Sequence, residues 1–167
     1  MRRIFPLAVM LLAVLTPFAR AAPLRTAFLP FILKDTSLPS PQSKPGPADL
    51  HRLELVDQVV EQGLVRSGEY IPLDLKPIAA QIAENDLVGC PDCAVSLARQ
   101  VGAQVVVTGW VQKVSGLIIN MTIIIRSVDT GKMIAAGDVS LRGDTDIAWT
   151  RAASWLVAHR LLPPGSK

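Results

Sequence analysis

The residues with the clearest capacity for chemistry are Cys90 and Cys93, which are separated by two residues in the segment Cys90-Pro91-Asp92-Cys93. They are the only cysteines in the chain, and a predicted helix over residues 94–101 follows them directly. A disulfide is the favoured interpretation, because the export signal described below implies an oxidising compartment. A bridge across so short a loop would stabilise the fold by roughly 2 kcal/mol and would fix the start of the helix.

Two other interpretations of this cysteine pair stay open. The spacing matches a thioredoxin-type redox dithiol, in which a helix N-terminus activates the first thiol. Such motifs follow a strand, however, and residues 86–89 are predicted to be a loop. A metal site would need two further ligands, and the only histidines, His51 and His159, show no spacing that favours them. We therefore predict no metal and no cofactor.

The sequence shows no other catalytic constellation. It contains no glycine-rich phosphate loop and no G-x-S-x-G segment, and no serine has an evident His and Asp companion. His51 is expected on the solvent-facing side of a helix. Asp144 and Asp146 lie at the start of a predicted helix, where capping and the helix dipole favour acidic residues. The sequence therefore favours a protein without enzymatic activity.

The first 21 residues have the pattern of a cleaved secretory signal peptide. A basic Met1-Arg2-Arg3 segment precedes an apolar run over residues 4–15, and Ala19-Arg20-Ala21 fits the small-x-small cleavage rule. The apolar run is too short to span a bilayer comfortably. The cleavage site lacks the cysteine that a lipid anchor requires, so a lipoprotein is not expected. We expect a periplasmic protein comprising residues 22–167, with no membrane span after cleavage.

The net charge of the chain depends on that first segment. The formal charge of +3 reflects 17 Lys and Arg against 14 Asp and Glu residues, and Arg2, Arg3 and Arg20 account for the whole excess. Removing these three leaves 14 basic residues (17 minus 3) against 14 acidic ones. Nucleic-acid binding, which needs a basic surface, is therefore not predicted.

The most apolar part of the mature chain, residues 103–128, organises the predicted fold. It contains the triplets Val105-Val106-Val107 and Ile123-Ile124-Ile125, and β-branched residues of this kind favour strands. Val114-Ser115-Gly116 is predicted to form the turn between them. A second turn leads to a third strand over residues 133–141, so the three strands form an antiparallel meander.

Earlier segments add parallel strands and helices. Pro30 lies within the first predicted strand, which is therefore either at a sheet edge or broken there. We predict one α/β (α+β) domain, a single mixed sheet of about five strands with helices packed on it, in the order β-α-β-α-α-β-β-β-α. Besides the meander, the predicted segments are a strand over residues 24–33, a Pro-rich loop over 34–48, helices over 50–67, 77–84, 94–101 and 146–161, and a strand over 70–73.

Two of the predicted helices have apolar residues at helical spacing, with Asp49 as the expected N-cap of the first. The stripe of the first helix is Leu53, Val56, Val60 and Leu64, and the expected inner face of the last helix is Ala148, Ala152, Trp155, Leu156 and His159. In residues 117–126 the odd positions are all apolar, whereas the even positions include polar residues. One sheet face is therefore expected to be buried, and the other to be partly covered or to face a partner.

Two tryptophans are candidates for exposure beside basic residues, a combination typical of protein-binding surfaces. Trp110 lies on the more polar face of its strand, and Trp149 lies one turn into the last helix, away from the expected apolar stripe. Lys113 and Arg142 are the basic residues expected near them. The alternative is that these tryptophans are buried under a loop such as that over residues 34–48.

The segment GCPDCAVSLARQVGAQVVVTGWVQKVSGLIINM, followed by RGDTDIAWTRAASWL, resembles a family of exported Gram-negative proteins with no established activity. Genes of that family often lie near those of pyrroloquinoline-quinone-dependent alcohol dehydrogenases and their cytochromes. The specific parts of the resemblance are C-x-x-C before a helix, GWVQKVS and RGDTD-x-x-W. The residues on these motifs are Cys90, Cys93, Trp110, Lys113, Ser115, Arg142, Gly143, Asp146 and Trp149.

The order of elements is also similar to that of the TolB amino-terminal domain and of CsgG, which are cell-envelope interaction modules. The resemblances imply a periplasmic accessory protein, with a quinoprotein dehydrogenase or its cytochrome as the expected partner. The expected partner-binding surface combines Trp110, Lys113, Ser115, Arg142, Asp146 and Trp149. Two alternatives stay open: a thiol-disulfide redox protein that uses Cys90 and Cys93, and a small-molecule binder, which would need an apolar pocket.

Overall fold

The structure is a computed structural model that describes residues 22–37 and 44–162. The signal peptide predicted over residues 1–21 lies outside these ranges, as do residues 38–43 of the predicted Pro-rich loop. Among the described residues, no helix combines the length and the apolarity needed to cross a membrane.

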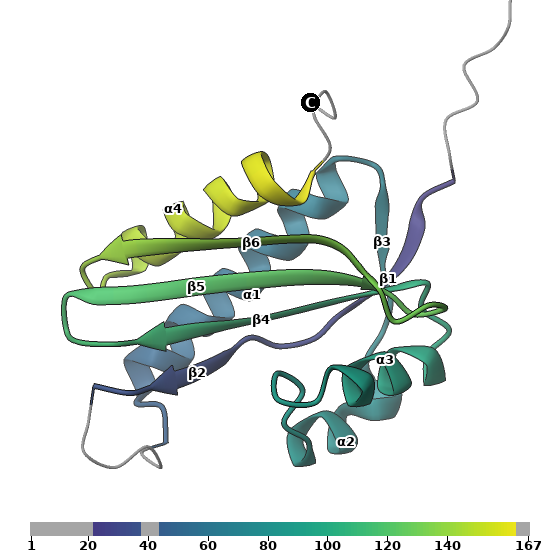
Figure 1. Cartoon of the computed structure of the whole chain (residues 1–167), viewed down its shortest axis with the longest axis horizontal. Coiled ribbons are helices and arrows are strands. Elements are labelled where there is room, and N and C mark those ends of the chain that lie inside the picture. Colours follow the sequence, from purple (N-terminus) through teal and green to yellow (C-terminus); the bar gives the residue numbers. More distant parts are fainter. Residues whose placement is uncertain (1–21, 38–43, 163–167) are drawn as a thin grey trace, which may run out of the picture.

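The described strands form one mixed sheet (Figure 1). Its order is β3-β1-β4-β5-β6, and β2 also pairs with β4. The β4–β5 and β5–β6 pairs are antiparallel, and the β1–β3, β1–β4 and β2–β4 pairs are parallel, which confirms the predicted fold class. The strands are β1 (Leu24–Phe28), β2 (Ile32–Asp35), β3 (Tyr70–Pro72), β4 (Val105–Lys113), β5 (Ile118–Ser127) and β6 (Met133–Arg142).

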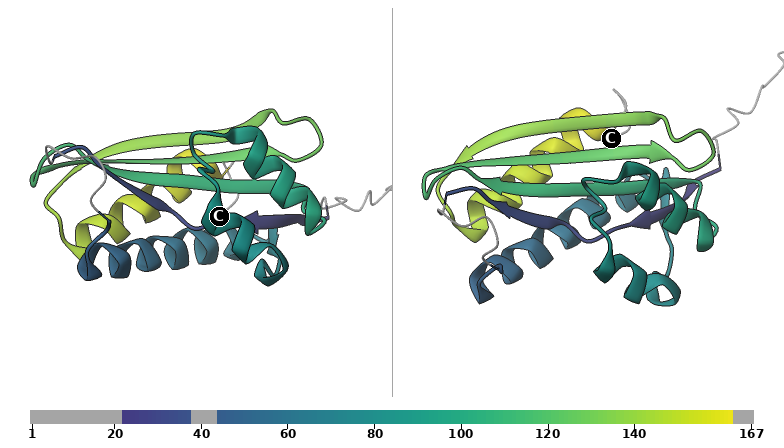
Figure 2. Two further views of the ribbon diagram at one scale, coloured as in Figure 1. Left: turned by 90° about the horizontal axis from the view of Figure 1, so that it is seen from below. Right: turned by 60° about the horizontal axis from the view of Figure 1, so that its bottom comes forward.

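The helices cover the two faces of the sheet unequally. Side by side on one face lie α1 (Pro47–Arg66) and α4 (Asp146–Leu156), which continues into the π-helical turn η2 (Val157–Leu161) (Figure 2). The other face is covered at one end only, by α2 (Ala79–Glu84) and α3 (Pro91–Gln100), with the short turn η1 (Lys76–Ile78) before them. In the part of the chain that the structure describes, no helix covers the rest of that second face (Figure 1).

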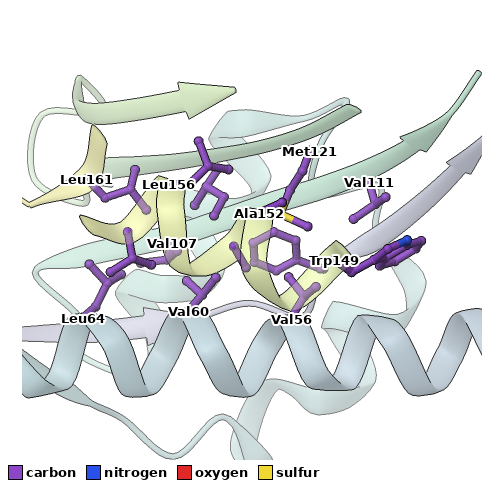
Figure 3. Packing of buried hydrophobic residues seen from close by; sticks show 14 of the residues in the cluster. Val56, Val60, Leu64, Val107, Val111, Met121, Trp149, Ala152, Leu156 and Leu161 are labelled. Carbon is purple, nitrogen blue, oxygen red and sulfur yellow. The ribbon is translucent and has the colours of Figure 1, made fainter. Parts of the chain in front are cut away.

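The larger core lies between the sheet and the helices α1 and α4 (Figure 3). The stripe predicted for the first helix is buried, and its residues Leu53, Val56, Val60 and Leu64 all belong to this core. Alternate residues of β5 complete it from the sheet side, because side chains on a strand point to opposite faces in turn. These residues are Ile119, Met121, Ile123 and Ile125, each fully buried.

The predicted inner face of the last helix is confirmed at Ala152 and Leu156 and is wrong at Trp155 and His159. The buried residues of α4 are Trp149, Ala152, Ala153 and Leu156, whereas Trp155 is 39% exposed. His159 is also exposed, and its ring stacks on Trp155 at 5.0 Å between centroids. Both sides of this helix carry apolar residues, so spacing alone does not identify the buried one. A hydrogen-bond partner for the Trp149 indole, described below, distinguishes the two sides.

The first predicted strand is broken at Pro30, as one of the two alternatives predicted. Its halves, β1 and β2, pair with successive parts of β4. Between them the Phe31 N–H donates to Asp57 Oδ1 of α1 at 2.9 Å instead of to a strand. The Phe31 ring lies so close to Gly109 of β4 that a Cβ there would be 2.2 Å from ring atom Cε1. Glycine at position 109 is therefore required for this packing.

Asp57 is the one described carboxyl group whose pKa is strongly raised. Burial raises it from 3.8 to about 7, the hydrogen bond from Phe31 opposes this effect, and the nearby Glu61 and Glu54 add to it. Because the folded state binds this proton more readily than the unfolded state, stability should fall as the pH rises from about 4 to about 7. Above that range the charged carboxylate remains a cost to the fold.

We predict that Asp57→Asn makes the chain more stable at pH 8 and removes this part of the pH dependence. The amide oxygen can still accept the Phe31 N–H, but it carries no charge that must be buried. The gain at pH 8 should be on the order of 1–2 kcal/mol, because solvent still reaches part of the side chain. Urea unfolding at pH 5 and pH 8 measures it, with the exposed Glu84→Gln as control. Equal pH dependence in the wild type and in Asp57→Asn would contradict this assignment.

Candidate functional site

Two of the motifs predicted to bind a partner meet at one end of the sheet. Lys113 ends β4, and Arg142 ends β6, where it pairs with Ile118 of β5. The Gly143 N–H donates to the Leu117 carbonyl at 3.3 Å and so joins the loop before α4 to the β4–β5 turn. The beginning of α1 lies at the same end (Figure 1). Three segments that are far apart in the sequence therefore converge here.

An ion-pair cluster fills the centre of this end. Lys113 Nζ contacts Asp49 Oδ1 and lies 2.7 Å from Asp144 Oδ2. Arg52 Nη1 is 3.1 Å from Asp144 Oδ1 and 3.3 Å from Asp49 Oδ1, and Arg52 Nε is 3.0 Å from Asp146 Oδ1. The cluster therefore links α1, β4 and the β6–α4 loop. Asp49 is not the N-cap that we predicted; Gly46 occupies that position, and Asp49 lies in the first turn of α1.

Lys113 is buried, with 9% of its surface exposed. Burial lowers its pKa, but the hydrogen bonds and charges of Asp144 and Asp49 outweigh that effect, so the pKa lies above its usual value of 10.5. Its contribution to stability is therefore present below pH 10.5 and is lost only as the pH rises through the raised value. A buried cation with two carboxylate partners is a structural support, and it is not free to contact a binding partner.

Trp149 forms the inner wall of the ion-pair cluster. It is fully buried between α1 and the sheet (Figure 3), and its Nε1–H donates to Asp144 Oδ1 at 3.1 Å. Lys113 Nζ and the Arg52 guanidinium each lie 5.9 Å from the ring centroid, within the range of cation–π attraction. Of the two alternatives for Trp149, exposure beside basic residues or burial under a loop, burial is the one observed. The residue is covered by α1, however, and not by the loop over residues 34–48.

The other predicted partner-binding residues are more accessible, but they do not all lie together. Ser115 shapes the β4–β5 turn, because its Oγ accepts the N–H groups of Leu117 and Ile118 at 3.3 and 3.1 Å. Arg142 and Asp146 are exposed at the same end. Trp110 is half-buried on the opposite sheet face, with Lys34 Nζ 5.3 Å from its ring centroid. The structure therefore places every predicted residue except Trp110 and the two cysteines at one end.

The outside of this end carries large apolar side chains that reach into solvent. They come from the first turn of α1, the β4–β5 turn with the start of β5, and the first turn of α4. The most exposed are Leu117 at 71% and Ile147 at 69%. We call the set the apolar end surface: Leu50, Val114, Leu117, Ile118 and Ile147. Sequence reasoning named none of these five residues, although Val114 belongs to a predicted turn and Leu117 follows it, where apolar residues have no core to enter.

Cys90 and Cys93 form a disulfide at the start of α3, at the other end of the sheet. Cys90 is also the N-cap of α3, and its Sγ accepts the Cys93 N–H at 3.3 Å. In the part of the chain that the structure describes, no group of three or more His, Cys, Asp or Glu residues could hold a metal ion. The disulfide thus closes a helix start and does not adjoin the ion-pair cluster.

A groove of about 660 Å³ opens beside α2. Its walls are mostly apolar and include Ile32, Ala79 and Ile82, with Asp74 and Lys76 among its few charged residues. A groove of this size and character is suited to holding an apolar molecule or side chain.

The comparisons with known proteins concern family and fold. The DUF3280 family, described as "Protein of unknown function (DUF2380)", matches residues 24–161. No curated protein matches the sequence.

Several solved structures resemble the chain at low identity. The LpoB C-terminal domain from Salmonella enterica has a TM-score of 0.52 and 15% identity, covering 74% of this chain and 86% of that one. A PelC dodecamer from Paraburkholderia phytofirmans has a TM-score of 0.51 and 10% identity, covering 84% and 90%. TolB from Acinetobacter baumannii, named in the sequence resemblance, is a weaker match, with a TM-score of 0.45, 15% identity and coverage of 84% and 29%. Identities this low show a shared fold and nothing about activity.

We predict that Lys113→Met lowers the free energy of unfolding by about 2 kcal/mol, because it leaves the partly buried Asp49 and Asp144 with Arg52 as their one remaining shared cation among the described residues. Adding Asp144→Asn to this variant should cost less than the same change in the wild type, since the two residues interact directly. Chemical denaturation of the two single variants and the double variant measures this coupling. The control is Lys132→Met, which removes an exposed lysine. Additive effects of Lys113→Met and Asp144→Asn would contradict the predicted coupling.

We also predict that the Cys90–Cys93 disulfide is structural. Its reduction potential should lie below about −300 mV, and its removal by a double change to serine should cost roughly 2 kcal/mol of stability. Equilibration with thiol redox buffers, followed by mass spectrometry of alkylated protein, measures the potential. A potential near that of disulfide oxidoreductases, together with mixed disulfides trapped by Cys93→Ser, would favour the redox alternative instead.

Proposed function

We propose that this chain, which belongs to the DUF3280 family of proteins of unknown function, is a non-enzymatic periplasmic protein that binds another protein through its apolar end surface. The observation that carries the proposal is the exposure of Leu117, Ile147 and their neighbours at one end. Scattered single apolar residues are common on protein surfaces, but a group from three converging segments is typical of an interaction site.

The support beneath this surface favours binding. Lys113 and Arg52 hold α1, β4 and the β6–α4 loop in one arrangement through their carboxylate partners. A surface that is already ordered loses little conformational freedom when a partner docks. The charged residues Arg142 and Asp146 are exposed at the same end and give the apolar centre a polar rim, as is usual in protein interfaces.

The location of the protein rests on its first 21 residues, whose pattern is that of a cleaved export signal. Association is compatible with this fold, since PelC, which shares it at 10% identity, was solved as a dodecamer. The finer proposal concerns the partner. The sequence resemblance implies a periplasmic quinoprotein alcohol dehydrogenase or its cytochrome, and the proposal of a protein partner does not depend on that identity.

A second candidate function, binding of a small apolar molecule, is favoured by the groove beside α2. That groove lies away from the apolar end surface, so the two functions can be tested separately. Molecules that remain bound to protein purified from the periplasm would be sought by native mass spectrometry, and a chain free of any ligand would count against this second function.

The test of the main proposal is capture of partners in the periplasm of a Gram-negative host that expresses the tagged chain, grown with and without an alcohol. We expect Leu117→Asp and Ile147→Asp to lose the captured protein, because a charge there disrupts an apolar contact. Ile134→Asp, at an apolar residue that is 53% exposed near the start of β6, is the matched control and should retain it.

Three outcomes distinguish the parts of this proposal. Loss of the captured protein with Ile134→Asp as well would show that the apolar end surface is not the binding site. Capture of a partner unrelated to alcohol oxidation, with the expected pattern of variants, would keep the binding surface and overturn the quinoprotein partner. Failure of the wild type to capture any protein under either growth condition would contradict a protein-binding role.

A further inference from the structure

One long strand of the sheet has a free side. In the described part of the chain, β6 pairs with β5 alone and forms one edge of the sheet. On the other side of the sheet the outer strands are β3, with three residues, and β2, with four, whereas β6 has ten. Natural proteins block such edges with proline, with charged residues (lysine above all) or with a very short strand. β6 contains no proline and no lysine, and its two charged residues, Asp138 and Arg142, have opposite signs. The N–H and C=O groups on its free side can therefore pair with another strand.

The second half of β6 is the more accessible part of this edge. The pairing with β5 is irregular at Ile125 and Arg126, opposite the start of β6. At Gly137, the middle of the strand, a Cβ would lie 2.6 Å from Arg160 Cβ and 3.0 Å from Leu156 Cδ2, so the end of α4 and η2 pack there on the sheet face that α1 and α4 cover. In Figure 1, α4 starts behind the end of β6 and runs obliquely past its edge. Residues 138–142 are thus the segment on which a further strand fits.

This segment carries two exposed charges without ion-pair partners among the described residues, Asp138 and Arg142. Both lie on the same sheet face as Ser140, because Val139 and Leu141 pair with core residues of β5. The two charges are four residues apart on an extended strand, about 13 Å, which is too far for them to pair with each other. Their spacing fits a neighbouring strand that places a basic residue opposite Asp138 and an acidic residue opposite Arg142.

We propose that the occupant of this edge is a second copy of the chain, whose β6 pairs antiparallel with the first in a register centred on Ser140. In this register, Asp138 of each copy lies opposite Arg142 of the other, so one two-fold axis produces two opposite-charge pairs. The axis is perpendicular to the sheet, and α1 and α4 of both copies therefore stay on the same side. Five residues on each strand pair, which is an ordinary strand length.

Neighbouring registers are less favourable for reasons of charge. Centring the pair on Asp138 would place the two Asp138 carboxylates opposite each other, and centring it on Gly137 would place Arg142 opposite Lys132. Centring it on Val139 places Asp138 opposite Ser140 and forms no charge pair. Only the register centred on Ser140 pairs both charges, and it uses the accessible half of the edge.

The test is the oligomeric state of the full chain, measured by sedimentation velocity over a range of concentrations. We expect a reversible wild-type dimer whose Kd rises by about tenfold or more in Asp138→Arg and in Arg142→Asp, because each change places like charges opposite one another twice. The double variant exchanges the two charges and should regain the wild-type Kd. Lys132→Asp and Asp129→Arg change the net charge equally outside the paired segment, and they should dimerise as the wild type does.

A mixing experiment tests the register directly. A mixture of Asp138→Arg and Arg142→Asp places opposite charges at both positions, so native mass spectrometry should show heterodimers in excess of either homodimer. A wild-type chain that stays monomeric at every concentration, or single variants that dimerise as the wild type does, would overturn the proposal. This result is independent of the proposed function, since capture of another protein by Leu117 and Ile147 can fail while dimers persist, or succeed without them.

Discussion

Lys113 is a charged side chain that folding removes from water, and it is stable there because Asp49 and Asp144 both contact its ammonium group. These carboxylates come from α1 and from the loop before α4, so the burial of one cation fixes two helices relative to the sheet. Trp149 fills the space beneath, and its indole N–H satisfies the remaining demand of Asp144. Every exposed residue at this end depends on that arrangement for its position.

The unequal covering of the sheet follows from local packing requirements. Phe31 donates its N–H to Asp57 of α1 instead of to a strand, and its ring packs over Gly109. The first strand is therefore divided, and α1 is linked to the sheet at this point. Among the described residues, the opposite face receives only the short helices near the disulfide, and the remainder of that face carries no helix. The described helices α1 and α4 therefore bury the larger core on one face of the sheet, and most of the other face carries no described helix.

The sequence predicted the sheet better than the site. Runs of valine and isoleucine with period-two alternation favour strands with one buried face. The antiparallel meander is found at the residues where these runs predicted it. The last helix offers apolar residues on two sides, and the choice of Trp149 over Trp155 depends on Asp144, Arg52 and Lys113 meeting in space. Asp49 has a residue type suited to an N-cap, but the structure pairs it with Lys113 of β4, a contact that no local pattern indicates.

The segment Arg142-Gly143-Asp144-Thr145-Asp146 shows why a motif with the appearance of a binding signature need not itself bind. Gly143, with φ of 89°, allows the turn, and Thr145 caps α4 by accepting the Ala148 N–H. Asp144 points into the ion-pair cluster, which leaves Arg142 and Asp146 to face solvent on either side of it. Arg142 belongs to the β6 edge and Asp146 borders the apolar end surface, so one rigid turn supports both surfaces. A change at Asp144, which holds this turn against α1 and β4, should therefore disturb both surfaces together.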